Sequence, residues 1–204
     1  PTTLSEENLS LLMESINKNI NLSCMEEFTL EAGRPDTITK GKMDIAKAGN
    51  VTRISINPQT MNEKTLKIIG RKHSIEDFEK AFKIAREVGF DVINTDLIAG
   101  LPSDTLESYE KTLDKAIELS AENITVHTLA LKRSSNIVTE SRKTNSGIVA
   151  AEMLSLTQKR LTEAGYVPYY MYRQSKCLGN LENVGWTKEG NECLYNVYMM
   201  EECH

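Results

Sequence analysis

The sequence predicts an α/β fold in which an open parallel sheet carries outer helices and a small, turn-rich appendage follows. Strand-like and helix-like segments alternate through the first 165 residues, the order that parallel βαβ units require. The segment DVINTDLIAGLP (91–102) is apolar on both faces apart from Asp96, as expected of a strand covered by helices. Only four strand-like segments occur, too few for a closed eight-stranded barrel, so we predict an open, partial barrel.

Five helices are predicted from apolar residues that recur at helical spacing. They are 5–18, 39–48, 74–88, a helix that opens at 104–107, and 149–165. The third begins at Ser74 with early acidic residues, which suit the exposed N–H groups of a first turn, and ends at Gly89. The segment 104–107 has the form of a capping box.

The four predicted strands are 27–31, 52–57, 91–102 and 123–130. Polar side chains stand at or just after the C-terminal ends of these strands: Glu31, Gln59, Asp96 and His127. Open α/β sheets and barrels place their ligand contacts at this edge. The pattern therefore favours a binding site there, although each residue taken singly could instead cap a turn.

Composition excludes several classes of protein. The net charge of −5 and the pI near 5.4 provide no broad basic surface, so no nucleic-acid partner is expected. No apolar run reaches the ~18 residues that a membrane span needs, and no leader segment is recognisable. The four cysteines form no CxxC pair, which favours reduced thiols in a cytoplasmic protein.

We predict a domain boundary near Gly165, giving a partial barrel over residues 1–165 and the start of a substrate-side domain over 166–204. Beyond Tyr166 the sequence becomes rich in tyrosine, asparagine and glycine, which indicates turns rather than further barrel repeats. The chain begins at Pro1 rather than methionine, so we expect it to be a piece of a longer protein.

A succession of motifs in the first 133 residues resembles the radical S-adenosylmethionine oxygen-independent coproporphyrinogen III oxidases, also called coproporphyrinogen dehydrogenases. The motifs are TLEAGRP (29–35), RISINPQ (53–59), GRKH (70–73), GF (89–90) and DLIAGLP (96–102). In the tail, YYMYRQ (169–174) and LGNLEN (178–183) resemble the clostridial and bacillar branch of that family.

The chain also departs from the family. The family's CxxxCxxC motif, whose thiolates hold a 4Fe–4S cluster, is absent here, as are the first two strands of the barrel. We expect the cluster ligands roughly fifty residues upstream of Pro1, a distance taken from the family. The 204-residue chain by itself should therefore bind no cluster and be inactive.

The resemblance implies that Glu31, Gln59, Arg71, Asp96 and Ala130 contact S-adenosylmethionine. Arg71 would bind the methionine carboxylate as a charge-assisted pair, and Glu31 would contact the methionine moiety or the ribose. Gln59 and Asp96 would face the adenosyl portion, with Ala130 beside the adenine or a second S-adenosylmethionine.

For the whole protein, the resemblance implies radical oxidative decarboxylation of the propionates of coproporphyrinogen III to vinyl groups in haem biosynthesis. S-adenosylmethionine and a 4Fe–4S cluster would be the cofactors, and the sequence does not identify the electron donor. Two alternatives stay open: a haem-binding chaperone of the same fold without decarboxylase activity, and a plain interaction module.

Other polar residues are weaker candidates. His73 is interpreted as a hydrogen-bonded loop residue, His127 as a minor site candidate, and the tail tyrosines as packing residues. Irregular spacing disfavours a metal site at Cys177, Cys193, Cys203 and His204. Contacts of substrate propionates with Lys132, Arg133 and Arg173 are possible, but solvated charge is the default interpretation.

Overall fold

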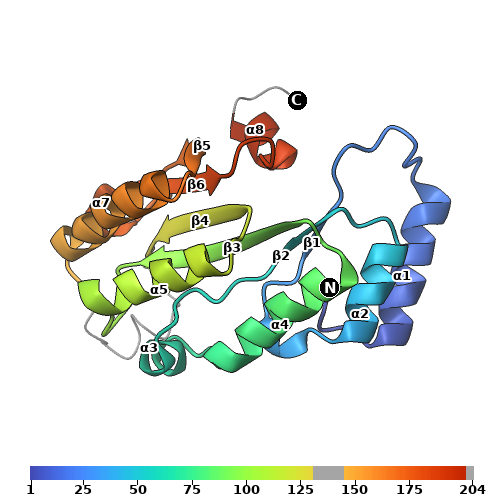
Figure 1. The fold of residues 1–204 in the computed structure, drawn as a ribbon, viewed down its shortest axis with the longest axis horizontal. Helices are drawn as coiled ribbons and strands as arrows, with labels where there is room; N and C mark the ends of the chain where they lie inside the picture. The colour runs from blue at the N-terminus through green and yellow to red at the C-terminus, as the bar shows by residue number, and fades with distance from the viewer. Residues whose placement is uncertain (131–144, 201–204) are drawn as a thin grey trace. The chain divides into compact units, whose positions relative to one another are not determined.

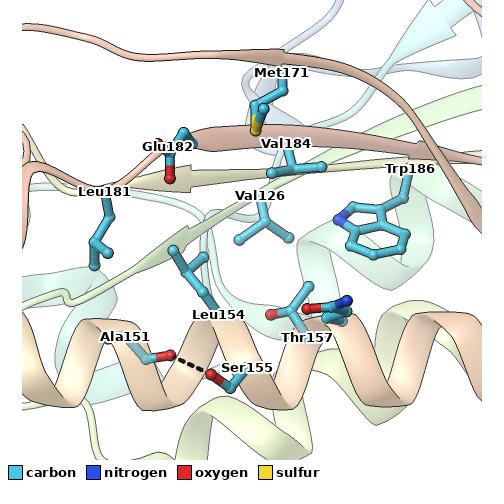
Figure 2. A pocket seen from close by; sticks show the side chains of 11 residues that line it. Val126, Ala151, Leu154, Ser155, Thr157, Met171, Leu181, Glu182, Val184 and Trp186 are labelled. Carbon is cyan, nitrogen blue, oxygen red and sulfur yellow. Dashed lines mark hydrogen bonds between the residues drawn. The ribbon is translucent and has the colours of Figure 1, made fainter.

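A computed structural model describes residues 1–130 and 145–200. Its strands form one six-stranded sheet in the order β1-β2-β3-β4-β6-β5, which has two end strands and is therefore open, as predicted (Figure 1). The chain divides into two compact units. The first unit comprises residues 1–58 and 73–94, and the second comprises 59–72 and 95–204.

The first unit holds the parallel strands of the sheet. Strand β1 (Thr29–Glu31) pairs in parallel with β2 (Arg53–Ser55), and β2 pairs in parallel with the first residues of β3 (Val92–Ala99). Its helical elements are α1 (Glu6–Asn19), the 3-10 turn η1 (Pro35–Thr37), α2 (Lys40–Ala48) and α4 (Ile75–Val88). Helices α1 and α2 lie side by side (Figure 1).

The helices of the first unit begin where the sequence predicts. The side chains of Ser5, Thr39 and Ser74 each accept a hydrogen bond from a backbone N–H of the first turn, which satisfies donors that a helix start leaves free. At α4 the bond is reciprocal, because the Asp77 carboxylate accepts from the backbone of Ser74. Gly89 ends α4 in the left-handed conformation, at a φ of 95°.

The second unit contains α3, the rest of β3 and all elements after β3. These are α3 (Glu63–Ile68), α5 (Leu106–Glu118), β4 (Asn123–Thr128), α7 (Gly147–Glu163), β5 (Val167–Tyr172), the 3-10 turn η2 (Leu178–Asn180), β6 (Asn183–Thr187) and α8 (Leu194–Met200). Helices α5 and α7 lie side by side (Figure 1), and the buried Tyr109 hydroxyl of α5 lies 2.8 Å from the Thr157 hydroxyl of α7.

The start of α5 differs in detail from the prediction. Its capping residue is Thr105, whose side chain and that of Ser108 form the capping box. Asp104 is instead buried at 2% exposure and accepts hydrogen bonds from Thr60, Asn62 and Ser108. A carboxylate that is taken out of water needs such donors, and they draw Asp104 inward rather than onto the helix end.

The tail adds two strands that the sequence pattern did not reveal. Strand β6 pairs antiparallel with β4 on one side and with β5 on the other, so the sheet of the second unit continues past residue 165. The boundary near Gly165 stays a prediction. Among the described residues no helix is both long and apolar enough to cross a membrane.

Candidate cofactor site

Strand β3 presents Asn94 and Asp96 on the same face. Burial alternates along the strand, so Ile93, Thr95, Leu97 and Ala99 are buried while Asn94 and Asp96 lie on the less buried face. The alternation follows from the two-residue repeat of a strand. The Asp96 side chain keeps 21% of its exposure, so its carboxylate is partly shielded yet accessible to a ligand.

Gln59 is held directly against this part of β3. Its backbone N–H donates to the Asp96 carbonyl at 3.0 Å, and its own carbonyl accepts from the Ile98 N–H at 2.9 Å. Gln59 is 7% exposed and adopts a φ of 70°, a left-handed conformation that is uncommon outside glycine. A buried non-glycine residue in this conformation is a strained position of the kind that clusters at functional sites.

The segment that follows Gln59 is anchored to α5 and its entry. The Thr60 hydroxyl donates to Asp104 at 3.3 Å, and the Met61 N–H donates to the Thr112 hydroxyl at 3.0 Å. Burial raises the pKa of Asp104, and the bonds from Ser108, Asn62 and Thr60 oppose that rise. Together these contacts fix the backbone from Gln59 to the start of α3.

Arg71 lies at the far end of the same segment. Gly70 turns the chain after α3 with a φ of 74°, and the Arg71 N–H closes the turn by donating to the Leu66 carbonyl at 2.9 Å. Arg71 is half-buried and belongs to the second unit together with Gln59 and Asp96. The structure thus joins Gln59 to Asp96 by hydrogen bonds, and places Arg71 on the segment that Gln59 begins.

Ala130 lies where β4 ends. It forms an antiparallel bridge with Cys177, and the neighbouring Leu129 carbonyl accepts from the Leu178 N–H at 3.0 Å. The Cys177 thiol is buried and donates to the Thr128 carbonyl at 3.7 Å. The tail therefore fixes the backbone beside Ala130, a role for Cys177 that the sequence alone did not indicate.

Glu31 belongs to the first unit, so its placement relative to the other four predicted residues stays a prediction. It is exposed at the end of β1, in register with Ser55. On the same unit, the buried Ser55 hydroxyl accepts from the Asn94 amide at 3.0 Å and donates to the Asn57 side chain at 2.9 Å. A polar network therefore joins the end of β2 to the first residues of β3.

His127 faces Asp96. Its Nε2 atom lies 3.7 Å from the Asp96 carboxylate, and its Nδ1 atom lies 3.2 Å from the hydroxyl of Tyr172 on β5. Sequence reasoning treated His127 as a minor candidate and missed Tyr172. The signal that could have identified it is the alternation of Tyr170 and Tyr172, which puts both rings on one face of a strand.

The remaining candidate residues from the sequence have separate outcomes. His73 is 3% exposed, with Nε2 3.2 Å from the Pro58 carbonyl, as the structural interpretation expects. Arg173 donates to Glu182, so its contact with a substrate stays a prediction. Within the described parts of the chain, no group of three His, Cys, Asp or Glu residues could hold a metal ion. Lys132, Arg133, Cys203 and His204 lie outside the described residues.

The fold and the polar residues at its strand ends can now be compared with known families. A family model described as the radical SAM superfamily matches residues 2–116, more than half of the chain. The chain therefore belongs to the radical SAM superfamily, whose cofactors are S-adenosylmethionine and a 4Fe–4S cluster.

Individual relatives confirm the resemblance to the oxygen-independent coproporphyrinogen III oxidase family. The chain is 40% identical over 205 residues to the "Oxygen-independent coproporphyrinogen-III oxidase-like protein HemZ" of Bacillus subtilis, covering 99% of this chain and 41% of that protein. It is 40% identical over 133 residues to the "Heme chaperone HemW" of the same organism, covering 65% of this chain and 35% of that protein. The chain thus spans less than half the length of these relatives.

Solved structures agree on the fold. The coproporphyrinogen III oxidase HemN of Escherichia coli superposes with a TM-score of 0.78 at 24% identity, covering 98% of this chain and 44% of that chain. The Elp3 protein of Methanocaldococcus infernus gives a TM-score of 0.62 at 17% identity, covering 76% of this chain and 42% of that chain. At these identities the likeness shows the fold alone.

The two cofactors fit the described residues unequally. S-adenosylmethionine carries a carboxylate, a ribose and an adenine, which a guanidinium, a carboxylate and an amide can bind, and Arg71, Asp96 and Gln59 supply these groups. An iron–sulfur cluster needs converging thiolates. The described cysteines do not supply them, because Cys24 is exposed while Cys177 and Cys193 are buried in separate parts of the tail. No cluster ligand is therefore assigned among the residues that the structure describes.

Proposed function

We propose that the full-length protein binds S-adenosylmethionine at the C-terminal ends of its sheet strands, with Gln59, Arg71, Asp96 and Ala130 as contacts on the second unit. The observation that carries the proposal is the strained Gln59 backbone, which is held to β3 through the Asp96 carbonyl and the Ile98 N–H, on either side of Leu97. The folding free energy that holds Gln59 in this conformation is explained by a ligand that needs its side chain there. Glu31 is proposed as a further contact from the family resemblance alone.

The proposed reaction is the oxidative decarboxylation of coproporphyrinogen III propionates to vinyl groups. When bound, the cofactors supply the radical chemistry, and the protein orients and shields it. The Arg71 guanidinium binds the carboxylate of S-adenosylmethionine through two parallel hydrogen bonds, and Asp96 and Gln59 orient its nucleoside part. The electron donor is not identified by these residues.

A haem chaperone is the second candidate function. A protein named as a haem chaperone supports it, because its 40% identity over 133 residues stands beside the 40% identity of the oxidase-like relative over 205 residues. Both candidates share the S-adenosylmethionine site, so the site does not distinguish them.

The test is made on the full-length protein after anaerobic reconstitution. S-adenosylmethionine binding is measured by calorimetry, coproporphyrinogen III turnover by fluorescence of the oxidised products, and haem binding by absorbance. Turnover that depends on S-adenosylmethionine supports the oxidase, whereas tight haem binding without turnover supports the chaperone. Failure to bind S-adenosylmethionine in a correctly folded, cluster-loaded protein would contradict both.

A further inference from the structure

Two tyrosines of the sheet-edge strand β5 reach across β6 to side chains of β4. The Tyr170 hydroxyl lies 3.2 Å from the Thr125 hydroxyl, and the Tyr172 hydroxyl lies 3.2 Å from Nδ1 of His127. The two rings are parallel to within 5°, with centroids 6.3 Å apart. The two tyrosines thus make equivalent contacts from β5 to β4, but only Tyr172 contacts His127, the residue that faces Asp96.

Strand β6, which lies between β4 and β5, leaves room for an aromatic ring at Gly185. Gly185 of β6 is in register with both Thr125 and Tyr170, so the Tyr170 ring crosses directly over it. A methyl group on Gly185 would overlap the Tyr170 ring. The absence of a side chain at Gly185 lets the Tyr170 hydroxyl reach β4, whereas Tyr172 is in register with Asn183.

The Asp96 carboxylate and the Tyr172 hydroxyl determine which nitrogen of the His127 imidazole carries the proton. Nε2 lies 3.7 Å from the Asp96 carboxylate, which is too long for a direct hydrogen bond. An unprotonated Nε2 would turn its lone pair toward that carboxylate, so the favoured tautomer carries its proton on Nε2. Nδ1 then accepts from the Tyr172 hydroxyl. Burial, followed by the negative charge of Asp96, raises the pKa of Tyr172, so its hydroxyl keeps the proton that it donates.

We propose that Tyr172 and His127 are positioning residues for Asp96, and that they hold its carboxylate in the orientation that binds S-adenosylmethionine. The inference rests on the proposed function of Asp96. The Asp96 and His127 side chains keep only 21% and 27% of their exposure, so the interaction between them is partly shielded from water. Outer partners of this kind fix ring and carboxylate orientation without touching the ligand.

The test uses matched variants of the reconstituted full-length protein, titrated with S-adenosylmethionine in a calorimeter. Tyr172→Phe should weaken binding about fivefold, while Tyr170→Phe, which loses an equivalent hydroxyl from the same strand, should stay within about twofold. His127→Gln places an amide N–H near the position of Nε2 but loses the acceptor for Tyr172, so it should weaken binding about as much as Tyr172→Phe does. His127→Asn can still reach Tyr172 but not Asp96, and should lose about tenfold.

The outcomes separate this inference from the proposed function. Equal weakening by Tyr170→Phe and Tyr172→Phe would overturn it, because the tyrosines would then act only by tying the strands together. Parent-like binding by Tyr172→Phe and His127→Asn, with weakened binding by Asp96→Asn, would overturn the positioning role alone. Parent-like binding by Asp96→Asn would instead overturn the proposed site. Thermal unfolding of each variant confirms that the titrated protein is folded.

Discussion

The left-handed backbone of Gln59 lowers the stability of the fold. Its φ of 70° costs an ordinary side chain about 1 kcal/mol that glycine does not lose. We therefore expect Gln59→Gly to be more stable than Gln59→Ala by about 1 kcal/mol in urea unfolding. Both variants should bind S-adenosylmethionine more weakly, because both lack the amide side chain.

A control for Gln59 is available on β2. Ser55 lies in a strand, where extended backbone favours alanine over glycine, so Ser55→Ala should be the more stable of the two variants at that position. The order of the glycine and alanine variants should thus reverse between the two sites. The same order at both would contradict the strain assigned to Gln59.

Asp104 is expected to make stability depend on pH. Burial raises its pKa above the ordinary value of 3.8, so the folded chain holds the proton more tightly than the unfolded chain does. The contribution of Asp104 to the free energy of unfolding is therefore largest below pH 3.8 and falls as the pH rises through its folded-state pKa. Asp104→Asn, which does not titrate, should gain stability relative to the parent over that range.

The measurement for Asp104 is urea unfolding of the parent and the variant at several pH values from about 3.5 to 7. Other carboxylates affect both proteins equally and cancel in the difference. A difference that stays constant, or that moves in favour of the parent as the pH rises, would show that Asp104 is not held in the raised-pKa environment described here.

At the scale of secondary-structure elements, β5, β6 and β4 depend on one glycine. Gly185→Ala would drive a methyl group into the Tyr170 ring, and we expect a loss of stability of about 1–3 kcal/mol, the usual cost of overpacking. Tyr170→Ala removes the obstacle, so adding Gly185→Ala to it should cost much less. Urea unfolding of the two single variants and the double variant gives the coupling directly.

A result in which Gly185→Ala costs the same with and without the Tyr170 ring would contradict this packing. Gly165→Ala is not a suitable control, because Gly165 has a φ of 83° and any side chain there is strained. Gly33→Ala is a suitable control for the cost of adding a methyl group away from Tyr170. The Gly33 backbone is not left-handed, and the methyl group would meet only the Asn57 side chain, at 3.3 Å.

At the scale of the whole molecule, the βα alternation could be predicted because each of its signals is local. Apolar spacing and the capping residues Ser5, Thr39 and Ser74 mark helices that the structure confirms. The four predicted strands are all present as well. The candidate site was predictable only as far as Gln59 follows β2 and Asp96 lies toward the C-terminal end of the neighbouring strand β3, which places them at the same edge of a sheet.

The rest of the fold depends on contacts between residues distant in sequence. Pro168 and Gly185 argue against strands locally, yet β5 and β6 form because they pair with each other and with β4. His127 and Tyr172 meet although they are 45 residues apart. Helix α3, six residues long, is too short to show a helical repeat.

The central claim is that Asp96 and Arg71 bind S-adenosylmethionine, and calorimetric titration of the reconstituted full-length protein tests it most directly. Asp96→Asn and Arg71→Lys should weaken binding by ~1–3 kcal/mol, the scale of a charged hydrogen bond. The controls Asp91→Asn and Lys72→Arg change equally charged, exposed neighbours and should have little effect, because Asp91 precedes β3 at the opposite end from the site. Binding by Asp96→Asn as tight as that of the parent would contradict the account.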